Sequence, residues 1–143
     1  MNCIVSKIFI DTNILVYTLD TNDQTKQNWS RNMLHKLVNE HQAVLSTQVL
    51  SEFFVVATKK LEADPIIIKN IIHNFHNMEI VNTDSGLVDE AIDISVIYKL
   101  SYWDSLIIAA AERAQCQFII SEDLNPGQNY RGIRLINPFT QDF

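Results

Sequence analysis

The chain alternates short apolar segments with longer amphipathic ones, and this alternation restricts its fold more than any other feature. The segment Lys7–Asp11 holds three consecutive apolar residues, two of them β-branched, which is typical of a strand buried on both faces. Strands that are separated by helices imply right-handed crossovers and a mainly parallel sheet covered on both sides. Five strands are predicted, at residues 7–11, 43–46, 79–81, 117–121 and 133–136.

The amphipathic segments between these strands predict helices. In the second of them Trp29, Met33, Leu34, Leu37 and Val38 fall on one face, as the helical repeat requires. Small polar residues suited to helix starts precede several of these segments, and a proline suits the first turn of another. Helices are predicted at residues 13–19, 23–40, 47–60, 65–74, 85–98 and 103–115.

The chain of 143 residues fits one domain, residues 1–143, that can bury a core without disulfides or structural metal. Only three glycines and three prolines leave little room for flexible linkers. Cys3 and Cys116 form no CxxC pair and are interpreted as small buried hydrophobes in a reducing compartment. No stretch is long enough to span a bilayer, and the N-terminal segment has no cleavable signal architecture, so a cytoplasmic protein is expected.

The formal net charge is −6, which excludes a protein that holds nucleic acid mainly through a broad basic surface. It does not exclude nucleic acid as a substrate. Four of the carboxylates form a candidate site, as argued next, and without them the charge is −6 + 4 = −2. Bound divalent cations would offset most of those four charges.

Three acids stand where predicted strands end or a predicted helix begins. Asp11 follows the apolar run 8–10, Asp123 lies just past residues 118–120, and Asp104 opens the helix that ends near residue 115. In a parallel sheet with right-handed crossovers, strand C-termini and helix N-termini share one edge, where ligands bind. We therefore expect these three acids to meet there.

Glu52 reaches the same edge from the second turn of the helix 47–60, at the margin of that helix's apolar stripe. No Lys or Arg stands three or four residues away from it to act as a partner. Four converging carboxylates without matching cations would raise one another's pKa values, and a hard divalent cation relieves this repulsion. Oxygen ligands suit Mg²⁺ or Mn²⁺, and such a site supports phosphodiester hydrolysis by an activated water.

Each acid alone also has a purely structural interpretation. Asp104 could cap its helix, and Asp11 could accept hydrogen bonds from turn amides. Asp123 could be an ordinary turn residue. Glu52 could be solvated after a small rotation of its helix. The hypothesis that all four acids have only structural roles is weaker than the hypothesis that they form a site.

At these residues the sequence resembles the PIN-domain nucleases, and within them the VapC-type toxin ribonucleases. Four segments carry the resemblance in order: Phe9–Tyr17, Ser46–Phe53, Tyr102–Ala111, and Ser121–Leu124 followed by Gly127. The resemblance implies a three-layer α/β/α sandwich with a five-stranded parallel sheet. It also implies a homodimer and, for the toxin branch, a cognate antitoxin protein that blocks the site.

By the same resemblance the protein would be a Mg²⁺- or Mn²⁺-dependent endoribonuclease. Asp11, Glu52 and Asp104 would bind the metal, and Asp123 would be the fourth ligand, although Glu122 beside it could take that role. Supporting residues would position the acids or the metal's waters; these are Thr12, Asn13, Ser105 and Ser121.

Several other residues have two interpretations. His73 and His76 could hold a transition metal but fit a solvated helix face better. Trp103 is the aromatic with the better claim to line a cleft, whereas Trp29 fits a core or an interface. The apolar faces around residues 29–38 and 53–57 could serve a dimer or an antitoxin helix. Basic residues that could touch RNA phosphate, or be plain surface, are Lys59, Lys60, Arg131 and Arg134.

Competing functions remain open. A haloacid-dehalogenase-type phosphatase also begins with an Asp after its first strand, but needs a second Asp where this chain has Asn13. A receiver domain is poorly supported, because it needs an acidic pair and a Lys at strand ends. Dinucleotide-binding and P-loop sites are excluded, because the chain has no glycine-rich loop. A nuclease-like fold without activity, acting as an RNA- or protein-binding module, is the alternative from another class.

Overall fold

The computed structural model of this chain describes residues 5–125 and 127–140. Strands and helices alternate through most of its length, as the hydrophobic pattern predicts. The strands are β1 (Lys7–Ile10), β2 (Gln42–Ser46), β3 (Glu79–Val81), β4 (Phe118–Ile120), β5 (Asn129–Tyr130) and β6 (Ile133–Ile136). The helices are α1 (Thr12–Tyr17), α2 (Gln24–Glu40), α3 (Thr47–Lys59), α4 (Pro65–Phe75), α5 (Ser85–Tyr98) and α6 (Tyr102–Arg113).

The strands form one sheet in the order β3-β2-β1-β4-β6-β5, and all neighbours are parallel except β5 with β6. The predicted mainly parallel sheet is confirmed, but the predicted count of five strands is wrong, since β5 adds a sixth. This two-residue edge strand pairs with β6 through a tight turn. Arg131 and Gly132 have φ values of 51° and 83° there, the left-handed geometry that two-residue hairpins require.

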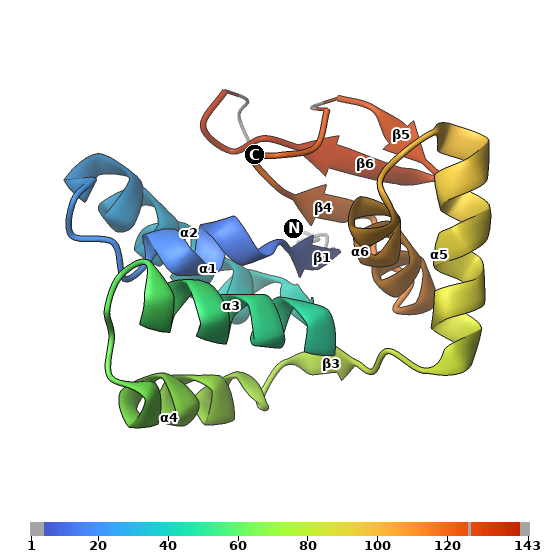
Figure 1. The fold of residues 1–143 in the computed structure, drawn as a ribbon. Coiled ribbons are helices and arrows are strands. Elements are labelled where there is room, and N and C mark those ends of the chain that lie inside the picture. The colour runs from blue at the N-terminus through green and yellow to red at the C-terminus, as the bar shows by residue number, and fades with distance from the viewer. Residues whose placement is uncertain (1–4, 126, 141–143) are drawn as a thin grey trace.

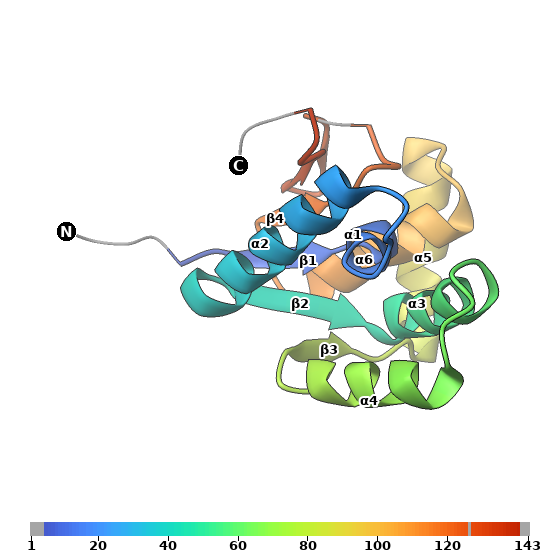
Figure 2. The same ribbon diagram turned by 90° about the vertical axis from the view of Figure 1, so that its left-hand side faces the viewer.

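Helices cover both faces of the sheet, which confirms the three-layer α/β/α architecture. Helix α2 packs on one face, and α6, backed by α5, packs on the other (Figures 1 and 2). The central strand β1 explains the strength of the apolar signal, because Ile8, Phe9 and Ile10 are all fully buried between these layers. Strand β2 is buried in the same way through Val44 and Leu45.

The strand order creates a switch point beside β1. The chain runs outward from β1 through β2 and β3, then returns across the other face to place β4 against β1. In such sheets the loops after the two strands at the switch point diverge and leave a crevice at their C-terminal ends. The two ends stay joined here, because the Asp11 amide donates to the Ile120 carbonyl at 3.0 Å.

Three helices begin at this same edge with polar caps. Asp11 caps α1, and the Ser46 hydroxyl accepts from the Val49 amide at the start of α3. In α6 the cap is Ser101, whose hydroxyl accepts from the Asp104 amide at 3.1 Å. The interpretation of Asp104 as the helix cap is therefore wrong. Asp104 lies in the first turn, where a carboxylate is favoured by the helix dipole.

Two predicted helix details need correction. Helix α6 ends at Arg113 instead of residue 115, because Gln115 has a φ of 60° and stops the helical repeat. On α2, Met33 and Leu37 are buried and Trp29 and Leu34 pack against the core, as predicted, but Val38 is 50% exposed. Gln27 is also buried on this helix, and its amide donates to the Thr18 carbonyl at 3.3 Å.

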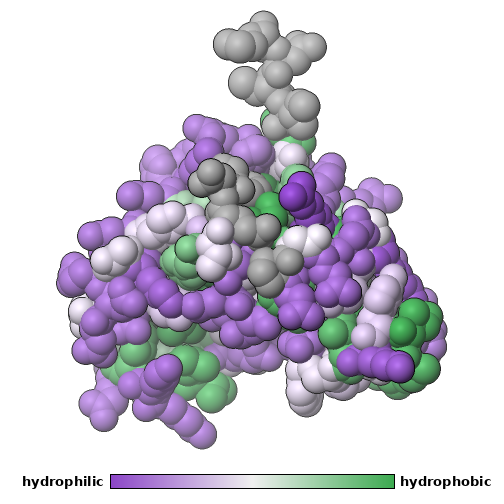
Figure 3. Space-filling view, turned by 90° about the horizontal axis from the view of Figure 1, so that it is seen from above, coloured by the Kyte–Doolittle hydropathy of each residue, from purple (hydrophilic) through white to green (hydrophobic). Residues whose placement is uncertain are grey.

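Within the described residues no single helix is long and apolar enough to cross a membrane. Among these residues, only α5 and α6 taken together, with a bend of 116° between them, reach the required length and composition. Cys116 is buried, as expected, and burial raises its thiol pKa to about 12. Cys3 lies outside the described residues. Figure 3 shows the molecule from above relative to the view of Figure 1. This face is mostly hydrophilic, and apolar side chains gather at its lower left and lower right.

Candidate functional site

Asp11 stands at the switch point with its carboxylate fixed. It is 8% exposed and accepts hydrogen bonds from the Thr12 amide and from the Ser121 hydroxyl, each at 2.7 Å. Burial raises the pKa of Asp11 to about 6, against these two hydrogen bonds, and the charges of Asp123 and Glu52 raise it further. A cation near such a carboxylate would favour its ionised form, because it offsets the cost of burying the negative charge.

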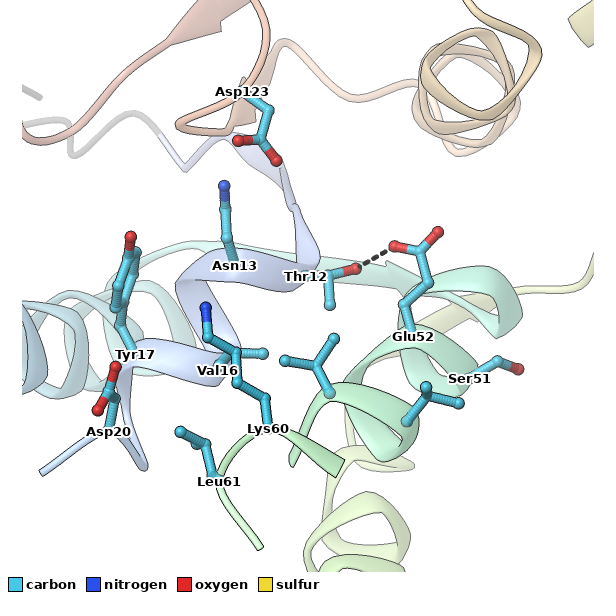
Figure 4. Close-up of a pocket in the computed structure, with 12 residues that line it drawn as sticks. Thr12, Asn13, Val16, Tyr17, Asp20, Ser51, Glu52, Lys60, Leu61 and Asp123 are labelled. Atoms are coloured by element: carbon cyan, nitrogen blue, oxygen red, sulfur yellow. Dashed lines mark hydrogen bonds between the residues drawn. The ribbon is translucent and has the colours of Figure 1, made fainter. Parts of the chain in front are cut away.

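Glu52 is joined to Asp11 through Thr12. The Thr12 hydroxyl donates to Glu52 Oε2 at 2.8 Å (Figure 4), and the Thr12 amide donates to Asp11 at 2.7 Å. Thr12 is itself buried, so this link between β1 and α3 is shielded from water. Glu52 at the core margin is thus satisfied by neutral donors and keeps its negative charge uncompensated.

Gln48, one turn before Glu52 on α3, holds the other oxygen. Its amide nitrogen donates to Glu52 Oε1 at 3.0 Å and to the Trp103 carbonyl at 3.2 Å, which ties α3 to the start of α6. Because both partners are acceptors, the nitrogen must face them, and the amide oxygen is buried without a hydrogen-bond partner among the described residues. Sequence reasoning gave Gln48 no role, although its spacing four residues before Glu52 is a usable signal.

Asp123 lies across the crevice from Glu52, near Asn13 (Figure 4). Its backbone amide donates to the Ser121 hydroxyl at 3.2 Å, so one serine positions both Asp11 and Asp123. Partial burial raises the pKa of Asp123, as do the charges of Glu122, Asp104 and Glu52. The Asn13 amide nitrogen points toward Asp123 and interacts with it, which works against the rise in the pKa of that carboxylate.

The structure links the four predicted acids, here called the acid cluster, to different degrees. Glu52 and Asp123 are close enough for their charges to act on Asp11, whereas Asp104, half-buried in the first turn of α6, acts on Asp123. No described Lys, Arg or His forms an ion pair with any of the four. Their role as a shared set of metal ligands stays a prediction.

Glu122 differs from these four acids because its carboxylate is paired within the protein, although its charge also acts on Asp123. Its two oxygens bond to Lys26 Nζ at 2.6 Å and to the Tyr17 hydroxyl at 2.5 Å. Burial raises the pKa of Glu122, but the bonds from Lys26 and Tyr17 outweigh this effect and bring it below its usual value. Glu122 is thus neutralised within the protein, which leaves Asp123 as the free acid after β4.

The donor set suits a hard divalent cation, because it consists of carboxylates that form no ion pair with any described Lys, Arg or His. As the side chains stand, however, no group of three or more His, Cys, Asp or Glu among residues 5–125 and 127–140 is arranged to hold a metal ion. Hydrogen bonds hold Asp11 and Glu52 in place, whereas the Asp104 and Asp123 side chains are more exposed than that of Asp11.

Two cavities flank Glu52. The first, of about 470 Å³, lies between α1 and α3 and combines Asn13, Glu52 and Asp123 with apolar side chains such as Val16 and Val55 (Figure 4). The second, of about 510 Å³, lies on the α6 side of Glu52. Glu52 therefore stands between the two cavities, and Asp123 lines the first of them.

The remaining predicted residues have mixed outcomes. Ser105 is fully buried, but its hydroxyl donates to the Ser101 carbonyl and not to an acid. His73 and His76 stack edge-on with their ring centroids 5.3 Å apart on an exposed helix face. Trp103 is 62% exposed beside the second cavity.

The basic candidates divide in the same way. Lys60 lines the first cavity, next to the acids. Arg131 instead forms salt bridges with Glu90 at 2.9 Å and with Glu112 at 3.1 Å, so its charge is already paired within the protein. Trp29 packs against Phe139, with the ring centroids 5.0 Å apart, as expected for a structural aromatic.

Several solved structures that are similar to this chain are toxins or toxin–antitoxin complexes. A toxin–antitoxin complex from Klebsiella pneumoniae is 18% identical with a TM-score of 0.67, over 92% of this chain and 97% of that one. Mycobacterium tuberculosis VapC20, described as a sarcin-ricin loop cleaving toxin, is 15% identical with a TM-score of 0.65, over 81% and 91%. VapBC2 from Rickettsia felis, bound to a promoter DNA fragment, is 16% identical with a TM-score of 0.65, over 90% and 96%.

At these identities the structural likeness establishes the fold alone. A comparison with curated protein sequences finds no significant match. The model of the PIN domain family matches residues 8–129, which span β1 to the first residue of β5 and include all four acids of the cluster. The chain therefore belongs to the PIN domain family.

Proposed function

We propose that this protein is a divalent-metal-dependent endoribonuclease and the toxin of a toxin–antitoxin pair. The observation that carries the proposal is the cluster of Asp11, Glu52, Asp104 and Asp123 at the switch point, with no cation of the described chain paired to it. Membership of the PIN domain family supports it, as does the fold shared with VapC toxins.

In this proposal the four acids bind Mg²⁺ or Mn²⁺. When bound, the ion supplies Lewis acidity to the phosphodiester and lowers the pKa of the attacking water. Asp11 provides the fixed anchor, since two hydrogen bonds set the orientation of its carboxylate. The Thr12 hydroxyl orients Glu52, and Ser121 couples Asp11 to the backbone of Asp123. Asp104 adds negative charge from the first turn of α6.

RNA is proposed as the substrate, with the reaction confined to the crevice. The net charge of −6 leaves no broad basic surface, so binding must come from local contacts in the crevice, to which a bound metal ion would add. Lys60, at the end of the first cavity, is one residue placed to meet a phosphate. VapC20 is described as cleaving the sarcin-ricin loop, and RNA cleavage comes to this chain only by that similarity.

The remaining parts of the proposal concern organisation. We propose one nuclease domain over residues 1–143, located in the cytoplasm, that forms a homodimer and binds a cognate antitoxin. Large apolar side chains that are exposed on α5 offer a surface for such association; they are Ile92, Val96 and Ile97. The predicted face at residues 53–57 offers less, because Phe53 and Ala57 are buried in the core.

The proposal is tested with Asp11→Asn, assayed for Mn²⁺ binding by calorimetry and for cleavage of a mixed RNA panel. Wild-type protein should bind Mn²⁺ and cleave RNA, and the variant should lose both while keeping its circular dichroism spectrum. Asp93→Asn, at an exposed position of α5, is the matched control and should retain both.

Two results would contradict the proposal. Full cleavage by Asp11→Asn would show that the acid cluster is not the active site. Wild-type protein that binds no Mn²⁺ and cleaves no RNA would favour the silent binding module instead. The antitoxin is tested separately by genome context, where a neighbouring short reading frame for a DNA-binding protein is expected.

A further inference from the structure

We propose that Trp103 and the cavity beside it form a subsite for one nucleobase of a single-stranded RNA, next to the bond held at the acid cluster. This inference rests on the proposed function, because it assigns one part of the substrate to a place near the acids. It concerns the second cavity, of about 510 Å³, whose walls come from the starts of α3 and α6 and from the segment before α5.

The position of this cavity relative to the acids is the first argument. Glu52 lines both cavities, so the second one opens directly from the acid cluster. Gln48 joins the two features, because its amide nitrogen bonds to the Glu52 carboxylate and to the Trp103 carbonyl. A group seated against Trp103 is therefore held at a defined place relative to Glu52.

The exposure of Trp103 is the second argument. The indole of Trp103 is 62% exposed, and tryptophan is a residue type enriched at binding interfaces. The Tyr102 ring packs against it edge-on, with the centroids 5.0 Å apart and an angle of 76° between the planes. This contact restrains the indole and leaves most of its surface available for stacking.

The chemistry of the walls is the third argument. Apart from Glu52, the described residues that line this cavity are uncharged, so it suits a neutral base better than a phosphate. Thr47 and Thr83 stand at its edge, and the Thr47 hydroxyl accepts from the Thr83 amide at 3.1 Å and donates to the Thr83 hydroxyl at 3.2 Å. The hydroxyl proton of Thr83 can then be donated to an acceptor on a base edge or to a 2′-hydroxyl. Unstacked RNA bases are recognised by this combination of an aromatic face and polar donors.

The test uses tryptophan fluorescence, because the chain has only two tryptophans. In an Asp11→Asn/Trp29→Phe double variant, which should not cleave RNA, Trp103 is the single tryptophan and can be excited selectively over the four tyrosines. Titration with a short single-stranded oligoribonucleotide should quench it, and an oligonucleotide of equal charge with abasic sites should not. In the same background, Trp103→Ala should weaken binding of a labelled oligoribonucleotide about tenfold, whereas Trp103→Phe should retain most of the affinity.

The outcomes separate this inference from the function on which it rests. If wild-type protein cleaves RNA but oligoribonucleotide binding leaves Trp103 fluorescence unchanged and Trp103→Ala binds normally, the subsite is wrong and the nuclease stands. If Trp103 is quenched by bases while wild-type protein cleaves nothing, the subsite stands and the nuclease fails. A change of fluorescence that follows protein concentration instead of RNA would overturn the subsite in favour of a protein interface.

Discussion

Replacing Asp11 with asparagine should stabilise the metal-free protein at neutral pH. Burial raises the pKa of Asp11 from 3.8 to about 6, so the folded chain binds this proton more tightly than the unfolded chain does. As pH rises from about 4 to about 6, the unfolded state releases the proton first and the folded state loses stability. Above pH 6 both states are ionised and the loss is complete.

The size of this effect follows from the shift. A difference of about 2.2 pKa units corresponds to about 3 kcal/mol at 1.36 kcal/mol per unit. Asparagine carries no charge and can still accept from the Thr12 amide, but its NH₂ group cannot accept from Ser121. About 3 kcal/mol is therefore an upper bound for the gain in the free energy of unfolding at pH 7.5.

The assay is denaturant unfolding of wild-type and Asp11→Asn protein with chelator present, at pH 4 and at pH 7.5. The variant should be more stable at pH 7.5 and nearly equal to wild type at pH 4. Mn²⁺ at pH 7.5 should then stabilise wild-type protein and not the variant, because a ligand bound only by the folded state raises its stability.

Asp93→Asn controls for the general effect of removing one negative charge, and should show no such dependence on pH. The reasoning is refuted if Asp11→Asn is less stable than wild type at pH 7.5, or if its advantage is the same at both pH values. In the first case the carboxylate contributes more through its hydrogen bonds than its burial costs.

Three further predictions use other contacts. Glu122→Gln should leave RNA cleavage within about twofold of wild type, while Asp123→Asn should lower it more than about tenfold; equal losses in a cleavage assay would contradict the separation of these acids. Thr12→Val should slow cleavage about tenfold by releasing Glu52, with Thr12→Ser as the control that retains the hydroxyl and the rate. Phe53→Ala should reduce the free energy of unfolding by about 3–5 kcal/mol, because Phe53 is fully buried against Phe75; a loss under about 1 kcal/mol in denaturant unfolding would contradict the packing.

Much of the fold could be predicted because its signals are local. Buried strands such as β1 and β2 are runs of apolar residues, and the helices between them repeat every 3.6 residues. The short strand β5 escaped prediction, since two residues form no pattern and are held by pairing with β6. Its one local signal is Gly132 after Arg131, at the turn that joins the two strands.

The acid cluster could be anticipated for a similar reason. Asp11 and Asp123 follow apolar runs in the sequence, and the rules of parallel sheets bring the ends of those runs to one edge. The hydrogen bonds that orient the acids could not be anticipated. Ser121 lies 110 residues from Asp11, and neither residue type alone indicates which partner the other takes.

The sequence by itself determined which residues could meet, because hydrophobic periodicity and chain direction place strand ends and helix starts on a common edge. Only the tertiary structure decided which of those residues keep a free charge. Lys26 and Tyr17 neutralise Glu122 and not Asp123, and Gln48 bridges Glu52 to α6. These choices depend on distances between side chains far apart in the sequence, and such distances are fixed only when the layers pack.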